Sequence, residues 1–151
     1  MAIVTGAGRG IGRATAEGLA AEGYAVVIAE LRKNPGHRTQ QNLTAMGRNA
    51  AFLPMDVSDP ASIRRGVNWV LRRFGRVDCL VNNAGVLRVG SLDELSVAEV
   101  TRMLQVNLHG PLLMTQAVLP AMLRRRSGRD RQCILTPRKI RSRAVCALLR
   151  Q

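Results

Sequence analysis

A run of glycines near the start of the chain has the residue types and spacing of an anion-binding turn. Residues 5–12 have the sequence Thr-Gly-Ala-Gly-Arg-Gly-Ile-Gly and follow a short apolar run. A strand that turns through glycines into a helix presents backbone N–H groups and a positive dipole end to an anion. Glycine also lets the backbone approach a pyrophosphate, because no Cβ lies between them. We therefore predict a dinucleotide site formed by Thr5, Gly6, Gly8, Arg9, Gly10, Ile11 and Gly12.

The surroundings of this loop favour a dinucleotide site over an ordinary glycine-rich turn. The spacing is Thr-Gly-x-x-x-Gly-x-Gly, because Ile11 stands where a Gly-x-Gly-x-x-Gly pattern needs a third glycine. A second apolar run, residues 24–29, ends at Glu30, which lies 18 residues after Gly12. An acid at the end of the second strand of a strand–helix–strand unit can accept hydrogen bonds from ribose hydroxyls.

Further motifs follow in order along the chain and point to one family. They are Asp56-Val57, then Asn82-Asn83-Ala84-Gly85, then Asn107 within Gln-Val-Asn-Leu. Together with the glycine loop, these motifs make residues 1–128 resemble a short-chain dehydrogenase/reductase. The resemblance implies an α/β fold with a doubly wound parallel sheet, Rossmann-like, of which only the N-terminal part is present. It also implies an NAD(P)-dependent oxidoreductase acting on alcohol or carbonyl substrates.

The resemblance assigns roles to residues that follow the predicted strands. Asp56 and Val57 would contact adenine, with the carboxylate accepting a hydrogen bond from the exocyclic amine. Asn83, Ala84 and Gly85 would line the adenosine side of the site and brace the central sheet. Thr5 would bond within the glycine loop or to the Asn-Asn-Ala-Gly segment. Each has a structural alternative: Asp56 could simply cap a strand end, and Thr5 could be an ordinary strand-end threonine.

Glu30 predicts a preference for NAD over NADP. A carboxylate repels a 2′-phosphate, whereas a 2′-hydroxyl can donate a hydrogen bond to it. Arg32 and Lys33 follow directly and could instead attract a 2′-phosphate. We favour NAD.

Only one member of the family's catalytic tetrad has a counterpart in this sequence. Asn107 would be the asparagine of the Asn-Ser-Tyr-Lys tetrad, supporting a water linked to the lysine; alternatively, it bonds its own helix backbone. In that tetrad the tyrosine moves the proton, and the lysine lowers the tyrosine pKa and holds the nicotinamide ribose. The single tyrosine here is Tyr24, and neither Lys33 nor Lys139 follows a tyrosine by four positions. We therefore expect this chain to be catalytically inactive.

Strand and helix patterns alternate along the chain and would position these residues. We predict strands at residues 2–5, 24–29, 51–55 and 77–81, and helices at residues 10–22, 38–46, 60–74 and 97–107. Pro35 and Gly36 mark a break before the second helix, and Ser96 with Glu99 forms a capping box. The last helix merges into an apolar segment, residues 108–123, in which Pro120 suggests a kink or an irregular end.

The pattern fails after residue 128. A fifth strand is due there, but only three apolar residues are contiguous before Pro137. Of the 23 lysines and arginines, 10 lie in residues 124–151 together with a single acid, Asp130. We interpret residues 129–151 as a basic segment outside the family pattern, disordered or read in a shifted frame. Nucleic-acid binding by this segment is the less favoured alternative, because it has no aromatic residue to stack on bases.

Length and composition bound the remaining possibilities. With 151 residues the chain forms at most one domain. The sequence contains no run of about 18 apolar residues, so we predict no membrane span. Three scattered cysteines form no metal or disulfide pattern, and His37 and His109 have no second ligand at metal spacing, so we expect a cytoplasmic protein without a metal. The apolar segment from Leu108 to Leu123 resembles the family's dimer helix, which makes a homo- or hetero-oligomer the expected assembly.

Overall fold

The computed structural model describes residues 1–91 and 93–124 in full, and the backbone alone of residues 131–134 and 146–147. The strands are β1 (Ala2–Thr5), β2 (Val26–Glu30), β3 (Ala50–Pro54), β4 (Cys79–Asn82), β5 (Arg131–Ile134) and β6 (Cys146–Ala147). The helices are α1 (Gly10–Ala21), α2 (Lys33–Ala45), α3 (Pro60–Phe74), α4 (Val97–Leu104), the π-helical turn η1 (Gln105–His109) and α5 (Gly110–Leu123).

The described strands form one sheet in the order β3-β2-β1-β4-β5-β6. β1 lies at the centre of the first four strands and pairs in parallel with both β2 and β4, while β3 pairs in parallel with β2. The chain therefore moves outward on one side of β1 and then crosses to the other side. Such a reversal creates a crevice at the carboxyl ends of the strands. The doubly wound α/β fold predicted from the sequence is confirmed.

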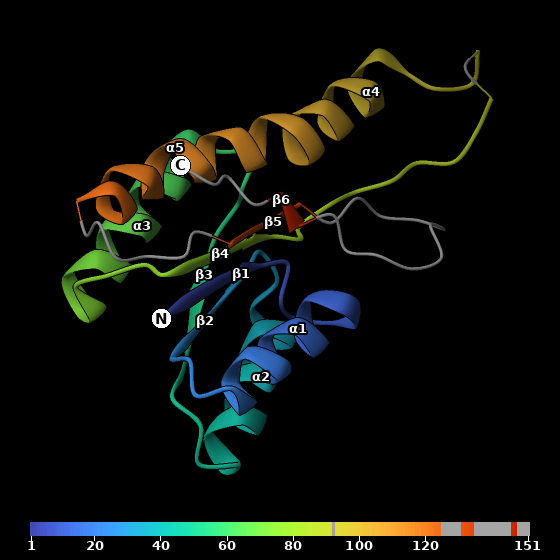
Figure 1. The fold of residues 1–151 in the computed structure, drawn as a ribbon. Helices are drawn as coiled ribbons and strands as arrows, with labels where there is room; N and C mark the ends of the chain where they lie inside the picture. Colours follow the sequence, from blue (N-terminus) through green and yellow to red (C-terminus); the bar gives the residue numbers. More distant parts are fainter. Residues whose placement is uncertain (92, 125–130, 135–145, 148–151) are drawn as a thin grey trace.

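Helices cover both faces of this sheet (Figure 1). On one face, α1 and α2 pack on Val4, Ile28 and Val81, which point to the same side of their strands. On the other face, α3 and α5 pack on Ile3 and on their strand neighbours Val27 and Leu80. Because successive strand residues face opposite sides, a strand covered on both faces must be apolar throughout. This requirement explains the unbroken apolar runs that identified the strands in the sequence.

Helix α2 begins five residues earlier than predicted and contains the residues taken as a break. Pro35 is the third residue of α2, where the missing N–H costs nothing, because the first-turn N–H groups have no partner within the helix. Gly36 is buried against the ring of Phe52, and a Cβ added there would lie 2.2 Å from a ring carbon. The predicted break was therefore wrong, since both residues serve the first turn and its packing.

The sheet also extends beyond the four strands that the sequence predicted. The backbone of β5 pairs in parallel with β4, and β6 pairs in antiparallel fashion with β5. An unpaired β4 edge offers backbone N–H and C=O groups to another strand whatever its side chains are. The fifth strand, which the apolar pattern of the sequence did not predict, is therefore present as β5. The rest of the predicted 129–151 segment lies outside the described residues.

The segment α4–η1–α5, which we call the helical arm, runs as one continuous helix and projects beyond the sheet (Figure 1). The predicted capping box is confirmed: the Ser96 hydroxyl accepts from the Glu99 N–H, and the Glu99 carboxylate accepts from the Ser96 N–H. Pro111 has no N–H, and its ring would clash with the carbonyl of Asn107 in a regular helix. The wider π-helical turn before Pro111 accommodates both. Past Pro120, the helix continues to Leu123.

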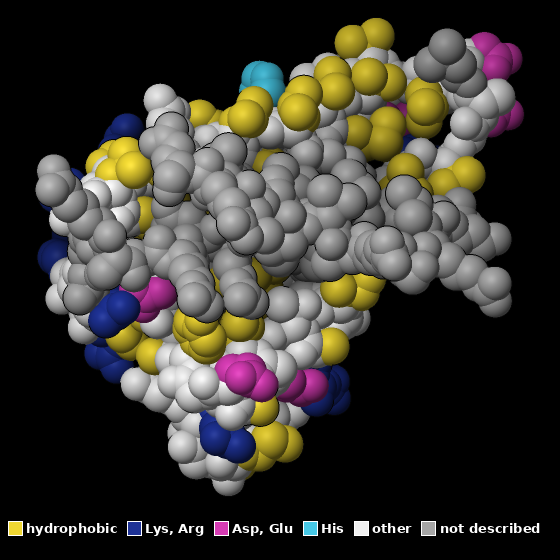
Figure 2. All heavy atoms as spheres, viewed as in Figure 1, with side chains coloured by type: hydrophobic (Ala, Val, Ile, Leu, Met, Phe, Trp, Pro, Cys, Tyr) yellow, Lys and Arg dark blue, Asp and Glu magenta, His cyan; other side chains and the backbone are white. Residues whose placement is uncertain are grey.

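Apolar side chains gather along the exposed side of the helical arm (Figure 2). Leu108, Leu112 and Leu123 are each more than half exposed, and Leu104 is equally exposed one turn before them. No helix within the described residues has the length and apolar character that crossing a membrane requires.

Candidate functional site

A cavity of about 500 Å³ opens at the carboxyl ends of β1, β2, β3 and β4. Its lining contains all but two of the predicted dinucleotide-binding residues: Gly6, Arg9, Gly10, Ile11, Gly12, Glu30, Asp56, Val57, Asn83, Ala84 and Gly85. The two exceptions, Thr5 and Gly8, are held by hydrogen bonds to residues of the lining. The fold therefore brings together residues from four separate stretches of the chain at the crevice that its topology creates.

At Gly6, Gly8 and Gly12 the glycine loop packs so tightly against its neighbours that a side chain would not fit. A Cβ added to Gly12 would lie 2.3 Å from both the Asn83 Nδ2 and the Gly6 carbonyl oxygen. A Cβ added to Gly8 would lie 2.8 Å from the Glu30 Oε2. Within the described residues, no side chain caps the first turn of α1, which begins directly after this loop. Its N–H groups therefore face the cavity end of the helix, where an anion would be stabilised.

Thr5 joins the glycine loop to the segment that follows β4. Its hydroxyl oxygen accepts from the backbone N–H groups of Asn83 and Ala84, both at 3.0 Å, and its hydroxyl lies 3.3 Å from the Val81 carbonyl oxygen. The Asn83 amide donates in return to the Thr5 and Gly6 carbonyl oxygens, at 2.9 and 3.2 Å. Thr5 is 1% exposed, so these bonds replace water contacts that the groups have lost. The predicted link from Thr5 to the Asn-Asn-Ala-Gly segment is present.

Glu30 is held at the end of β2 by two backbone donors. Its Oε2 accepts from the Gly8 N–H at 3.0 Å, and its Oε1 accepts from the Arg32 N–H at 3.1 Å. Thr39 lies behind the same loop and donates to the Gly8 carbonyl at 3.3 Å. The carboxylate is therefore fixed between the glycine loop and the cavity, with lone pairs left for further donors.

Asp56 lies at the end of β3 within a short polar network. Its Oδ1 accepts from the Ser58 N–H at 2.8 Å and from the Ser58 hydroxyl at 2.6 Å. Arg102 of α4 donates to the Ser58 Oγ at 2.7 Å. Partial burial alone would raise the pKa of Asp56, but the Ser58 hydrogen bonds and the nearby Arg102 guanidinium hold that pKa below its usual value. Asp56 is therefore an ionised acceptor at neutral pH.

Val57 and Ile11 also line the cavity, and they differ in burial. Val57 is 8% exposed and packs against the start of α5, where a Cβ added to Gly110 would lie 3.0 Å from the Val57 carbonyl oxygen. Ile11, in contrast, is 64% exposed on the first turn of α1. Val57 thus offers a buried apolar wall, whereas Ile11 offers an open one.

Asn107 lies in the π-helical turn and bonds to the loop after β4 rather than to its own helix. Its Oδ1 accepts from the Val86 N–H at 2.9 Å, and its Nδ2 donates to the Val86 carbonyl at 2.8 Å. Val86 lines the cavity, so Asn107 stands one residue behind it. The sequence placed Asn107 in a helix but could not identify this partner.

Ser58, Thr39 and Arg102 are contributors that the sequence analysis missed. Ser58 was not among the predicted site residues, and Arg102 has no distinguishing neighbour on α4. Arg102 comes close to Asp56 only because the helical arm crosses the end of β3. That crossing has no local signal in the sequence.

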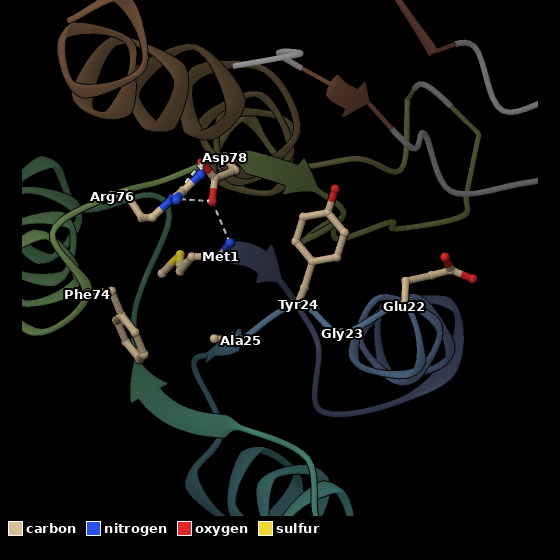
Figure 3. Close-up of a pocket in the computed structure, with 8 residues that line it drawn as sticks. All are labelled: Met1, Glu22, Gly23, Tyr24, Ala25, Phe74, Arg76 and Asp78. Carbon is tan, nitrogen blue, oxygen red and sulfur yellow. Dashed lines mark hydrogen bonds and ion pairs between the residues drawn. The ribbon is translucent and has the colours of Figure 1, made fainter. Parts of the chain in front are cut away.

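A second hollow, of about 420 Å³, lies at the opposite, amino ends of the strands (Figure 3). In it the Met1 ammonium and the Arg76 guanidinium both point at the Asp78 carboxylate. Partial burial alone would raise the pKa of Asp78, but Arg76 and the ammonium together hold it below its usual value. The acid here is thus neutralised by its own chain.

Comparison with known proteins agrees with this geometry. Residues 1–129 match a family model described as short chain dehydrogenase. An uncharacterized oxidoreductase of Thermotoga maritima is 38% identical over 128 residues, which cover 85% of this chain and 50% of that protein. A 3-oxoacyl-acyl-carrier-protein reductase of Escherichia coli is 40% identical over 129 residues, which cover 85% of this chain and 52% of that protein.

Solved structures give the same result. A short-chain dehydrogenase of Burkholderia cenocepacia, in complex with NADP, superposes with a TM-score of 0.77 at 38% identity. The match covers 80% of this chain and 50% of that chain. This chain therefore spans about half the length of the relatives it matches.

Proposed function

The chain belongs to the short-chain dehydrogenase/reductase family, and from that premise we propose that it binds an NAD(P) dinucleotide in the cavity at the carboxyl ends of β1–β4. The observation that carries this proposal is the glycine cradle. Gly10 lines the cavity at the start of α1, and a Cβ there would meet no atom within 4 Å. Because no side chain among the described residues caps the first turn of α1, this open edge suits the close approach of a pyrophosphate to backbone N–H groups.

In this proposal each wall of the cavity holds one part of the dinucleotide. The glycine loop, from Thr5 to Gly12, holds the pyrophosphate together with Arg9. Asp56 and Val57 hold the adenine, and Asn83, Ala84 and Gly85 line the adenosine side while Asn83 also braces the loop. When bound, the dinucleotide supplies the hydride acceptor or donor of an alcohol–carbonyl oxidoreduction. The chain's own contribution is to orient it and to shield it from water.

We propose that the site prefers NAD to NADP because of Glu30. Its carboxylate is held in place by Gly8 and Arg32, and its remaining lone pairs suit ribose hydroxyls. Titration calorimetry of the 151-residue chain with each dinucleotide is the direct test. We expect NAD to bind about tenfold more tightly than NADP, and Glu30→Gln to narrow that ratio, since a carboxylate near a 2′-phosphate is repulsive. Tighter binding of NADP would overturn the preference, and binding of neither would overturn the proposed function.

We further propose that the 151-residue chain does not turn over substrate by itself. Asn107 corresponds to one residue of the family's tetrad, and the sequence offers no Ser with a Tyr-x-x-x-Lys. Incubating the purified chain with NAD and a panel of primary and secondary alcohols tests this through NADH absorbance. Sustained NADH formation that scales with protein concentration would contradict it.

The exposed leucines of the helical arm favour a second role, pairing with another chain. Leu108 of η1 and Leu112, Leu119 and Leu123 of α5 form an exposed apolar row along the helical arm. A row of this kind suits packing against a second helix of similar character, either of another copy or of a complete relative. If so, Leu112→Glu should lower the mass measured by light scattering, while Thr101→Glu on the neighbouring helix α4 should not.

Residues 129–151 are, in our proposal, a separate basic segment outside the dinucleotide-binding part, residues 1–128. The hypothesis of a shifted reading frame is tested by translating the underlying nucleotides in the other two frames. A frame that supplies a Ser and a Tyr-x-x-x-Lys after residue 129 would support it, and the absence of both would remove it. The dispersed cysteines are consistent with a cytoplasmic protein, which cell fractionation would test.

A further inference from the structure

Arg102 reaches from the helical arm to the loop after β3. Its Nη1 donates to the Ser58 Oγ at 2.7 Å, and its Nη2 lies 3.7 Å from the Asp56 Oδ2. Arg102 and Asp56 both line the cavity at the carboxyl ends of the strands. Arg102 therefore links the helical arm to the cavity wall where the adenine end of a dinucleotide would lie.

The network makes the two oxygens of Asp56 different. Oδ1 accepts both the Ser58 N–H and the Ser58 hydroxyl hydrogen. A hydroxyl has one hydrogen to donate, so its lone pairs are left to accept from Arg102. Oδ2 faces the Arg102 guanidinium, whose Nη2 lies 3.7 Å away. The rotation of the carboxylate is thus set, with Oδ2 as the oxygen available to a ligand.

We propose that Arg102 is a positioning residue that holds Asp56 ready to read the purine base, and so makes the site select a 6-amino purine over a 6-oxo purine. The amine of adenine donates to a carboxylate oxygen. The carbonyl of hypoxanthine at the same position would bring two acceptors together. This inference rests on the proposed function, because it concerns the adenine end of the same site.

The test compares NAD with nicotinamide hypoxanthine dinucleotide, in which a carbonyl replaces the 6-amine of the base and N1 carries a hydrogen. Calorimetry on the full chain should give NAD an advantage of about tenfold or more, the size expected for one charge-assisted hydrogen bond. Arg102→Met should reduce that ratio to about twofold or less, because the carboxylate loses its orientation. Arg102→Lys should restore part of it. The ratio is the readout because losing a positive charge from the cavity lining weakens the binding of both anionic ligands alike.

A double-mutant cycle separates positioning from general stabilisation of the arm. Asp56→Asn should abolish the preference, and adding Arg102→Met should change it no further if Arg102 acts through Asp56. Arg88→Met is the matched control. Arg88 pairs with Glu99 of α4, the helix that carries Arg102, but it does not line the cavity. It should leave the ratio unchanged, and thermal melting should report any loss of folding in each variant.

The outcomes are distinct. An unchanged affinity ratio in Arg102→Met would overturn this inference while leaving dinucleotide binding intact. So would an Arg102→Met change in that ratio that is equally large in the wild-type and Asp56→Asn backgrounds. A wild-type chain that binds NAD without any preference would also overturn it. If the wild-type chain binds neither dinucleotide, the proposed function fails first and this inference fails with it.

Discussion

The two ends of the same sheet carry hollows of similar size but opposite chemistry. At the amino ends, a hollow of about 420 Å³ is lined by Asp78 together with Met1 and Arg76, both of which pair with the Asp78 carboxylate (Figure 3). At the carboxyl ends, about 500 Å³ is bordered by the first turn of α1 and by the oxygens of Glu30 and Asp56. In a parallel sheet only the carboxyl ends lead into helix N-termini, so only that end gathers backbone donors aimed at a ligand.

The difference teaches that the size of a hollow does not identify a site in this fold. The two ends differ in whether the carboxylates are paired with cations of the chain or keep lone pairs for a ligand. The Asp78 carboxylate is paired with both Arg76 and the Met1 ammonium. Glu30 is instead held by two backbone N–H groups, which orient a carboxylate without cancelling its charge. Asp56 is held through its Oδ1 by Ser58, while Arg102 lies 3.7 Å from its Oδ2.

The largest effect should come from Gly12→Ala at the carboxyl end. The new methyl would lie 2.3 Å from the Asn83 amide and the Gly6 carbonyl, so the loop must move and the Asn83 bonds must break. We expect a loss of about 2–4 kcal/mol in the free energy of unfolding, from overpacking and lost hydrogen bonds. Dinucleotide binding should fall below detection. Urea denaturation and calorimetry measure the two quantities.

The matched change at the amino end is Gly23→Ala. Gly23 has a φ of +86°, and a Cβ there would meet no atom within 4 Å. The left-handed backbone should therefore cost about 1 kcal/mol of stability. Dinucleotide affinity should stay at the wild-type value. Equal losses of affinity in both variants would mean that the glycine loop acts only through global stability.

Thr5→Val should have the next largest effect. Valine keeps the shape of threonine but leaves the buried N–H groups of Asn83 and Ala84 without their acceptor. We expect a loss of about 1–3 kcal/mol in the free energy of unfolding. Thr15→Val is the control, since Thr15 bonds only to the Ile11 carbonyl on the outside of α1, and it should change stability by less than about 0.5 kcal/mol. A neutral Thr5→Val would show that the link between β1 and the Asn-Asn-Ala-Gly segment is dispensable.

The smallest effect should come from Asp78→Asn, and it should depend on pH. The lowered pKa of Asp78 means that its ion pairs stabilise the fold above the unfolded-state pKa of about 3.9 and stop doing so as the pH falls through the lower folded-state value. At pH 7 the substitution should cost about 1 kcal/mol, and this difference should shrink below about pH 4. Denaturation at several pH values measures it. Altered dinucleotide affinity at pH 7 would break the contrast between the two ends.

Most of the fold was predictable because its signals are local. Apolar runs marked β1 to β4, Asp59 and Gly75 bounded α3, and Ser96 with Glu99 marked the start of α4. The errors arose where tertiary contacts override local signals. Pro35 and Gly36 look like a break until Phe52 is seen to pack on Gly36. The backbone of β5 pairs with β4 although the sequence there lacks a long apolar run.

The candidate site was predictable to a similar degree. Sequence motifs identified the glycine loop, Glu30, Asp56 and Asn83. Their meeting at one edge of the sheet follows from the topology. Arg102 and the Val86 partner of Asn107 were not predictable, because each depends on how the helical arm crosses the sheet.

The pair formed by Asn107 and Val86 has a consequence for motion. One amide side chain matches both backbone groups of Val86, so the loop is held as it would be by a neighbouring strand. Val86 is otherwise 37% exposed, and an exposed loop N–H normally exchanges with solvent deuterium at once. Its exchange must wait until the arm lifts from the loop and both bonds part together. The hydrogen-exchange rate of the Val86 amide therefore reports how often the helical arm separates from the loop after β4.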